Sequence, residues 1–400
     1  MVDVTSQVKD IQIFEDLFSP FITATLVLRE SLDLINLFPF SGQEYAYIKA
    51  TTPTLENGNL EMVFYIYKLT NREMMGDRSM AYVLHLISQE ALVDINKKTS
   101  KPFQGKISDL ARFMIEDKND GLETKKAAII EETVNGIKYI SNFWSPLKNL
   151  SYLSNIAVNI SQSPSYTFFE NRDGFNFVSL ESLYIKPVYQ EFIFDNYNRP
   201  TLPDGQVLRD VNEEFKRIKS INIPQAFDYI DRATHGMYGS TMVGIDINTK
   251  KYYFKNYTML DDFKSEQSLN EFPLASQTDI FRPLASLMKS NRAFGTHNGY
   301  SDNTNSVYRQ RRASLLQRGN SSQINVVVPG RLDYTVGQKV RVNLNKTEPI
   351  SVNELDYRDK MFSGNYIITA LNHNINRSQH ECSMELSKDS TEMDLNGTKQ

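Results

Sequence analysis

Cysteine is nearly absent from this chain, which limits how the fold can be stabilised. The sequence has 400 residues and one cysteine, Cys382. A single thiol cannot form an internal disulfide, and one cysteine cannot form an all-thiolate zinc site, so we expect stability to come from packing. Folding in a cytoplasm fits this composition, although a cysteine-poor secreted protein stays open.

The sequence also lacks long apolar runs and an excess of positive charge. No run of about 18 apolar residues occurs, so no membrane-spanning helix is expected. The first residues, 1–7, have neither a basic region nor an apolar one, so they do not resemble a signal peptide. The formal net charge is −4 and the pI about 5.9, which argues against a dedicated nucleic-acid binder.

Catalytic and cofactor motifs are missing as well. The sequence contains no phosphate-binding loop, no dinucleotide fingerprint, no G-x-S-x-G elbow and no H-E-x-x-H. Two of the five histidines, His373 and His380, fall on strands expected to be neighbours and could form a metal pair, but no third ligand is evident. A barrel residue satisfied by its neighbours is the simpler interpretation of His373. We therefore expect no catalytic, cofactor-binding or metal-binding residues and no cofactor.

Adjacent carboxylates are the remaining candidates for chemistry. They occur at Glu131-Glu132, Glu213-Glu214 and Asp261-Asp262. A glycosidase needs two carboxyl groups that face each other across a cleft, whereas neighbours in sequence usually point apart. We interpret these pairs as solvated surface. A cell-wall hydrolase stays open as the main enzymatic alternative.

What the sequence does contain favours a folded, strand-rich protein of several units. The length exceeds what one core usually supports, so two to four domains are expected. Hydrophobic residues make up 40% and charged residues 23%, which excludes global disorder. The 21 tyrosines and 23 phenylalanines favour strands and large interfaces.

The first hundred residues predict antiparallel strands. Apolar side chains alternate with others along 20–29, a period of two. The run from Met62 to Tyr67 is apolar or aromatic on both faces, so we expect it to be covered on both sides, the second cover being a neighbouring subunit. The strands predicted here are 8–14, 20–29, 43–51, 60–70 and 79–88.

The middle of the chain predicts mixed structure. One helix carries Ile107 to Ile115 on one face, and a second begins at Ser145-Pro146 and continues its apolar stripe to Ile160. Further predictions are a hairpin at 165–179, a loop at 195–206, a strand near 215–222, a helix opened by Pro224, a hairpin at 241–256, an irregular stretch at 291–306 and a polar helix at about 306–318.

That last helix holds the one basic concentration, Arg309, Arg311, Arg312 and Arg318. Arginines there could grip an acidic partner or phosphate. A solvated polar helix with Leu315 and Leu316 buried is the simpler alternative. We favour that alternative or a protein partner over nucleic acid.

The C-terminal part again predicts strands, near 339–344, 366–371 and 381–387, and the last dozen residues are polar and expected to fray. Both strand-rich ends could be copies of one barrel.

Four stretches resemble a known family. They are Phe21–Ser31, Leu37–Glu44, Val328–Val340 and Phe362–His373. Their turns and strands are similar to those of the central baseplate hub proteins of contractile-tailed, T4-like bacteriophages, a superfamily that includes late control protein D and the hub part of type VI secretion spike proteins. The resemblance is strongest over 1–90 and 325–388.

The resemblance implies a β-rich α+β fold in which two similar antiparallel β-barrel tube domains are joined by mixed linking and inserted domains. The expected division is a first tube barrel at 1–103, a mixed domain at 104–207, a second tube barrel at 208–245 plus 321–390, an insertion at 246–320 and a flexible tail at 391–400.

The resemblance also implies a structural, non-enzymatic role. Three chains would form a pseudo-hexameric ring in the virion, assembled in the host cytoplasm, that joins the six-fold tail tube to the three-fold central spike. The expected partners are the sister chains, the spike protein (tail lysozyme or needle), tube initiator proteins, the tape-measure protein, and DNA as non-specific cargo in the lumen. The hub of a related contractile injection system is an alternative.

Overall fold

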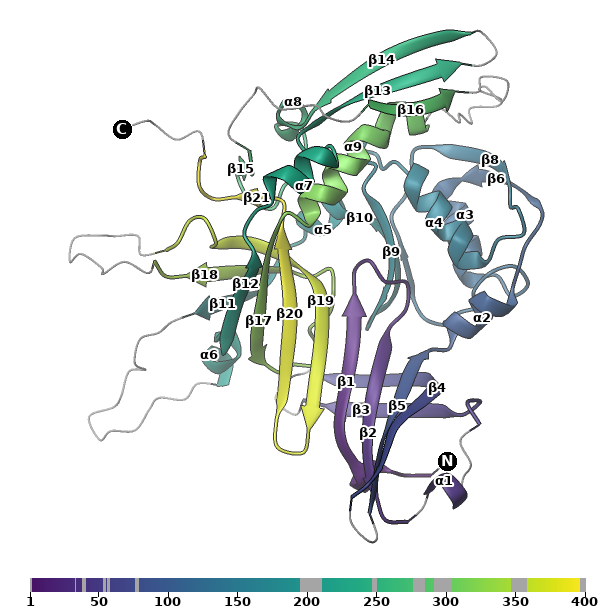
Figure 1. Cartoon of the computed structure of the whole chain (residues 1–400), viewed down its shortest axis with the longest axis vertical. Coiled ribbons are helices and arrows are strands. Elements are labelled where there is room, and N and C mark those ends of the chain that lie inside the picture. The colour runs from purple at the N-terminus through teal and green to yellow at the C-terminus, as the bar shows by residue number, and fades with distance from the viewer. Residues whose placement is uncertain are drawn as a thin grey trace, which may run out of the picture.

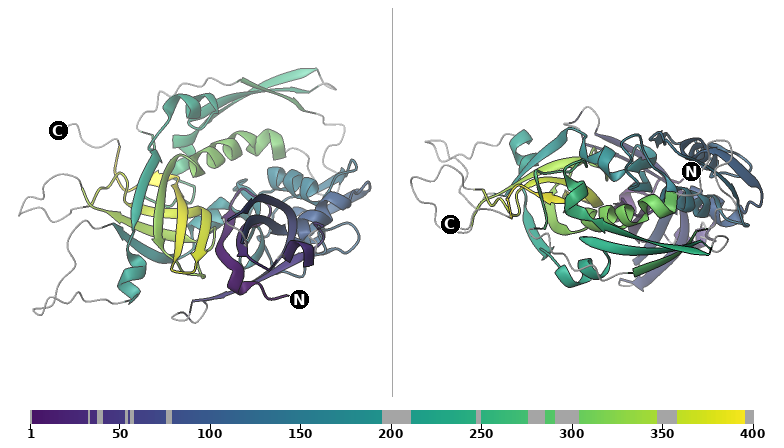
Figure 2. Two further views of the ribbon diagram at one scale, coloured as in Figure 1. Left: turned by 60° about the horizontal axis from the view of Figure 1, so that its bottom comes forward. Right: turned by 90° about the horizontal axis from the view of Figure 1, so that it is seen from above.

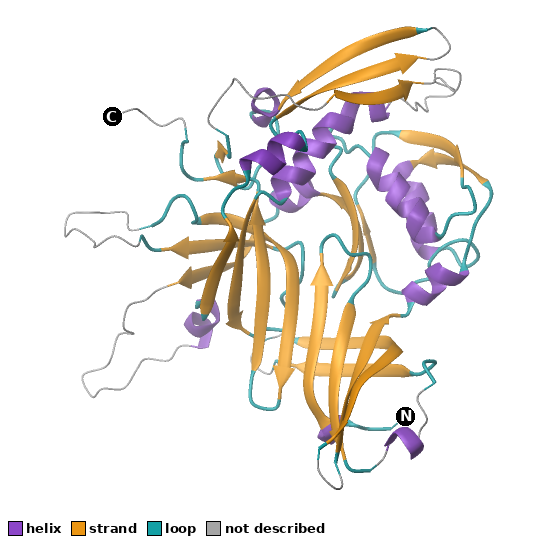
Figure 3. Cartoon of the chain, in the orientation of Figure 1, coloured by secondary structure: helices purple, strands orange, loops and turns teal. Residues whose placement is uncertain are grey.

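Figure 1 shows the chain as a computed structural model in which strands dominate and most helices, α1 and α6 excepted, gather at one end of a long sheet. The strand-rich α+β class expected from the sequence is confirmed (Figure 3). The structure describes residues 2–32, 34–37, 41–52, 55, 58–75, 79–194, 211–246, 250–275, 285–290, 304–346 and 358–395.

The N-terminal strands form an antiparallel sheet in the order β1-β2-β5-β4-β3. Every second side chain of β2 is buried, which is the alternation that the sequence predicts. These strands curve round a core that includes Ile13, Leu26, Phe64 and Leu84 (Figure 2, left). The elements are a short 3-10 turn at Thr5–Gln7, β1 Val8–Asp16, β2 Thr23–Glu30, α1 Leu34–Leu37, β3 Tyr45–Thr51, β4 Asn59–Met74 and β5 Met80–Ser88.

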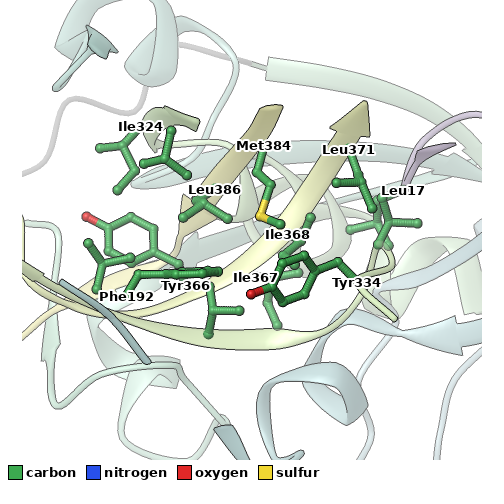
Figure 4. Packing of buried hydrophobic residues seen from close by; sticks show 14 of the residues in the cluster. Leu17, Phe192, Ile324, Tyr334, Tyr366, Ile367, Ile368, Leu371, Met384 and Leu386 are labelled. Atoms are coloured by element: carbon green, nitrogen blue, oxygen red, sulfur yellow. The ribbon is translucent and has the colours of Figure 1, made fainter. Parts of the chain in front are cut away.

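The C-terminal strands form a second antiparallel set, β12-β17-β20-β19, and β18 also pairs with β19. β11 joins β18 in parallel. The largest core cluster lies here, with Tyr334, Tyr366, Ile368 and Leu386 almost fully buried (Figure 4). The strands are β11 Val188–Phe194, β12 Ser220–Gln225, β17 Ser322–Pro329, β18 Lys339–Leu344, β19 Gly364–Asn376 and β20 His380–Lys388.

One strand pair joins the two sets into a single 11-stranded sheet. β1 pairs antiparallel with β19 from Asp10↔Asn376 to Asp16↔Ala370. At this seam, each part of the chain also contributes one leucine to the core of the other part. Leu17, at the end of β1, packs in the C-terminal core, whereas Leu332 packs in the N-terminal core. The seam therefore ties together segments more than 350 residues apart.

A mixed unit lies beyond one end of the N-terminal strands (Figure 1). Helices α3 and α4 pack on the hairpin of β9 and β10 around a separate core. Ser145 caps α4 by accepting from the Lys148 N–H, as predicted. The elements are α2 Glu90–Asn96, β6 Pro102–Lys106, α3 Ile107–Glu116, β7 Ala128–Ile130, β8 Gly136–Ile140, α4 Pro146–Ile156, β9 Tyr166–Asn171, β10 Gly174–Ser179 and α5 Leu180–Tyr184.

A separate three-stranded sheet, β14-β13-β16, extends from the helices at the top of Figure 1. The long helix α9 runs beneath it and contacts β13, α4 and β20. The elements are α6 Val211–Lys216, α7 Tyr229–Thr234, β13 Gly239–Asp246, β14 Lys251–Thr258, α8 Met259–Phe263, β15 Phe272–Pro273, β16 Ala285–Ser290, α9 Thr304–Gly319 and β21 Ser390–Thr391.

Three local predictions are wrong. Pro224 does not open a helix but lies in β12, and the next helix begins at Tyr229 after the capping Asp228. The strand predicted near 215–222 is present as β12, although it begins only at Ser220, and residues 215–216 belong to α6. Helix α4 ends before Ile160, which is 84% exposed. The last dozen residues do not fray throughout, because Ser390 and Thr391 are buried in β21 against β15.

Two predicted irregular segments fall largely outside the described residues. These are the loop at 195–206 and most of the stretch 291–306, whose last three residues belong to α9. None of the helices in the described part of the chain combines the length and the apolar character needed to cross a membrane.

The exchange of leucines across the seam predicts that both strand sets unfold together. Leu17→Ala and Leu332→Ala should each lower the free energy of unfolding of the joined strand sets by about 2–5 kcal/mol. Leu17→Ala leaves a cavity in the C-terminal core, and Leu332→Ala leaves one in the N-terminal core. Denaturant unfolding monitored by tyrosine fluorescence and by circular dichroism measures this. Leu37→Ala is the matched control, since Leu37 is 62% exposed. Two transitions, of which only one moves in each variant, would contradict the shared seam.

Candidate assembly surface and its supports

Three of the four arginines of α9 make contacts within the protein rather than pointing to solvent. Arg318 is 1% exposed and pairs with the equally buried Glu266, which also accepts from Arg311 Nε at 2.9 Å. Arg312 donates to the backbone carbonyls of Pro164 and Tyr166. The interpretation of α9 as a solvated basic face is therefore wrong for Arg311, Arg312 and Arg318, although Leu315 is buried as predicted. Arg309 alone of the four is exposed.

Other polar side chains of α9 hold the small sheet in place. Gln310 Nε2 donates to the Ser240 carbonyl at 3.0 Å and to the Lys255 carbonyl at 3.2 Å. Ser314 Oγ donates to the Met237 carbonyl at 2.6 Å. One helix thus connects the mixed unit, the C-terminal strands and the inserted sheet, which explains why its composition is polar while its side chains are buried.

The buried pair makes Arg318 a structural residue. Arg318→Met should lower the free energy of unfolding by about 3 kcal/mol or more, because Glu266 would keep a buried charge with fewer partners. Thermal and denaturant unfolding measure the loss. Arg309→Met is the same substitution on the exposed face of the same helix and should change stability by less than about 0.5 kcal/mol. Equal effects of the two substitutions would refute the buried role.

Glu15 is a second buried connection, at the end of β1. Its carboxylate accepts from Thr335 Oγ1 at 2.6 Å, the Val336 N–H at 3.0 Å and the Arg172 N–H at 3.1 Å. These donors come from the C-terminal strand region and from the β9–β10 turn. Burial raises the pKa of Glu15 to about 7, although the three hydrogen bonds oppose the rise. Three units therefore meet at one carboxylate.

The raised pKa predicts a pH dependence of stability. The folded chain keeps the Glu15 proton up to about pH 7, whereas the unfolded chain releases it near its ordinary value of 4.5. Stability from this group is therefore present below pH 4.5 and is lost as pH rises to about 7, by up to about 3 kcal/mol. Unfolding of wild type and Glu15→Gln across this range tests it, with the exposed Glu132→Gln as control. If Glu15→Gln keeps the wild-type slope, the assignment fails.

The paired carboxylates do not form an opposed catalytic pair. Glu131 accepts from the Ser179 N–H at 2.6 Å and from Asn159 Nδ2 at 2.9 Å, so it is structural rather than solvated, whereas Glu132 beside it is exposed. Glu213 forms an exposed ion pair with Lys216. Asp261 is exposed, and burial raises the pKa of Asp262.

The strands β3 and β4 present apolar side chains on both faces, as the sequence predicts. Ile48, Phe64 and Ile66 point into the core. The opposite side forms the outer aromatic face, which consists of the cross-strand pairs Tyr45–Tyr65 and Tyr47–Val63 together with Tyr67, two residues further along β4. Tyr45 is 60% exposed, and Tyr47, Val63 and Tyr67 are between 45% and 49% exposed. Exposed apolar and aromatic patches are a common feature of protein–protein interaction sites.

The two histidines singled out in the sequence do meet. His373 Nδ1 and His380 Nε2 lie 3.3 Å apart on neighbouring strands. Cys382 is a third member of this cluster, since its Sγ lies 3.2 Å from His373 Nδ1. It was not among the residues singled out in the sequence. The missed signal is the spacing of two between His380 and Cys382, which places both on one face of a strand.

Comparison with solved structures defines the class of fold. The chain superposes on a tail protein from Neisseria meningitidis MC58 with a TM-score of 0.54, at 11% identity, over 96% of this chain and 93% of that one. The 43 kDa tail protein of prophage MuSo2 from Shewanella oneidensis gives a TM-score of 0.52 at 10% identity, over 96% and 94%. The fold is that of phage tail proteins.

A curated relative carries a more particular description. The chain is 20% identical to the "Probable baseplate hub protein gp334" of Vibrio phage KVP40, over 97% of this chain and 91% of the relative. No family model matches the sequence. The resemblance to phage baseplate hub proteins that the sequence predicts is therefore confirmed.

Proposed function

We propose that this protein is the central structural hub of a phage tail baseplate. Full-length similarity to a baseplate hub protein and the tail-protein fold support this role. The role needs no catalysis, and the paired carboxylates expected to matter for a hydrolase are held by structural contacts or stand on the surface. The virion is the proposed location, after assembly in the host cytoplasm.

The observation that carries the assembly model is the outer aromatic face. A single chain leaves this face in water, although its tyrosines have the amphipathic character that suits interfaces. We propose that three chains form a closed ring in which a sister chain covers the face. Closure also protects strand edges that would otherwise invite aggregation.

The two strand sets then have equivalent roles. Three chains with two sets each would present six similar positions to a six-fold tube and three to a spike. The division at 1–103, 104–207, 208–245 plus 321–390, 246–320 and 391–400 describes the proposed units. The proposed partners are the spike protein, tube initiator proteins, the tape-measure protein and DNA passing through the lumen. A net charge of −4 suits a conduit, because it does not grip phosphates.

Mass in solution tests the ring. Native mass spectrometry of the chain alone and mixed with a candidate spike protein should show a species of three times 46.0 kDa, alone or with spike chains added. Tyr47→Asp and Tyr67→Asp should each weaken association about tenfold or more, since an interfacial charge would lose its water. The variants should stay folded because both side chains face outward.

Phe143→Asp is the matched control for these variants. Phe143 is 69% exposed but lies in the mixed unit, away from the outer aromatic face. Its substitution should leave the trimer intact. A trimer unaffected by Tyr47→Asp and Tyr67→Asp would exclude this face, and a mixture that yields only monomers or dimers would exclude the ring.

A further inference from the structure

Three potential metal ligands converge where β19 and β20 pair. His373 on β19 stands directly opposite Cys382 on β20, and His380 lies two residues before Cys382 on the same face. His373 is 1% exposed and Cys382 is fully buried. Their ligand atoms, His373 Nδ1, His380 Nε2 and Cys382 Sγ, all lie within 4.8 Å of one another.

The spacing of these atoms matches that of ligands already arranged round one ion. In a tetrahedral zinc site with Zn–N bonds of about 2.0–2.1 Å and a Zn–S bond of about 2.3 Å, two nitrogens lie about 3.3 Å apart and a nitrogen and a sulfur about 3.5 Å. The two nitrogens here are 3.3 Å apart. Cys382 Sγ lies 3.2 Å from the His373 nitrogen and 3.8 Å from the His380 nitrogen.

The surrounding backbone holds the His380 ring toward the other two ligands. The Gly330 N–H donates to the His380 carbonyl at 2.9 Å. A side chain at Gly330 would overlap the His380 ring, so glycine is required for this close approach. Gly330 therefore leaves room for the His380 ring, besides its place in the turn after β17.

The cluster offers two imidazole nitrogens and one thiol sulfur as donors to a cation. Burial lowers the pKa of His373 to about 3 and that of His380 to about 4. Burial raises the pKa of the Cys382 thiol to about 12. A bound divalent cation reverses this, because a coordinating thiol is deprotonated outright.

We propose that His373, His380 and Cys382 form a zinc site with three protein ligands, in which the fourth coordination position is left to water. Two imidazoles and one thiolate are ligands that suit Zn²⁺ rather than Mg²⁺ or Ca²⁺. Binding releases the Cys382 proton, and zinc then links two strands of the C-terminal set. Because His373 also stands opposite Ile13 of β1, the ion stabilises the strand that forms the seam.

Cobalt provides a direct spectroscopic test on the full-length chain. After dialysis against a chelator, titration with Co²⁺ should give one equivalent bound, with a thiolate-to-cobalt charge-transfer band in the near ultraviolet. Zn²⁺ should displace it stoichiometrically. Since Cys382 is the only cysteine, that band reports this site without any variant. If the folded wild-type chain shows no such band at micromolar Co²⁺, the proposal is overturned.

Variants then test Cys382 and His380 as ligands. Cys382→Ser should abolish the charge-transfer band, and His380→Gln should weaken metal binding about tenfold or more while the chain stays folded by circular dichroism. His235→Gln is the control, because His235 is exposed at the C-terminal end of α7. Zn²⁺ should raise the melting temperature of wild type and His235→Gln, and raise that of His380→Gln much less. Unchanged zinc affinity in His380→Gln would contradict the ligand set.

Discussion

The pairing of β1 with β19 is the contact on which the rest of the molecule depends. It converts two antiparallel sets, each with its own core, into one sheet of 11 strands. Glu15 stands at one end of this pairing and bonds both to the C-terminal strand region and to the mixed unit. Leu17 and Leu332 lock the cores across it. The N-terminal strands therefore cannot move as an independent unit without exposing buried apolar surface and an unpaired carboxylate.

The two faces of β3 and β4 differ in what covers them. The inner face of β3 and β4 is packed by the chain's own aliphatic and aromatic residues, while the outer aromatic face is exposed in the single chain. Helix α9 supplies comparable rigidity at the other end of the molecule through its buried arginines. The proposed ring would need this division, because an interface can hold sister chains in register only if the surface that it uses does not deform.

Much of the strand layout could be predicted from the sequence because one-sided burial leaves a period of two. That signal located the strands at both ends, and the Ser145-Pro146 cap located α4. The seam itself could not be predicted, since it joins residues such as Asp10 and Asn376 that only the fold brings together. The sequence also led us to place the α9 arginines in solvent, because an exposed ion pair and a buried one are formed by the same residue types. Cys382 was overlooked for a related reason, as cross-strand register is invisible without the fold.

Assembly is the central claim, and a cryo-electron microscopy reconstruction of the purified particle tests it most directly. We expect three chains around an open channel, with Tyr45, Tyr47 and Tyr67 of each chain buried against its neighbour and the β1–β19 seam unchanged from the single chain. A particle in which these tyrosines remain in solvent, or in which the two strand sets separate at the seam, would contradict the account.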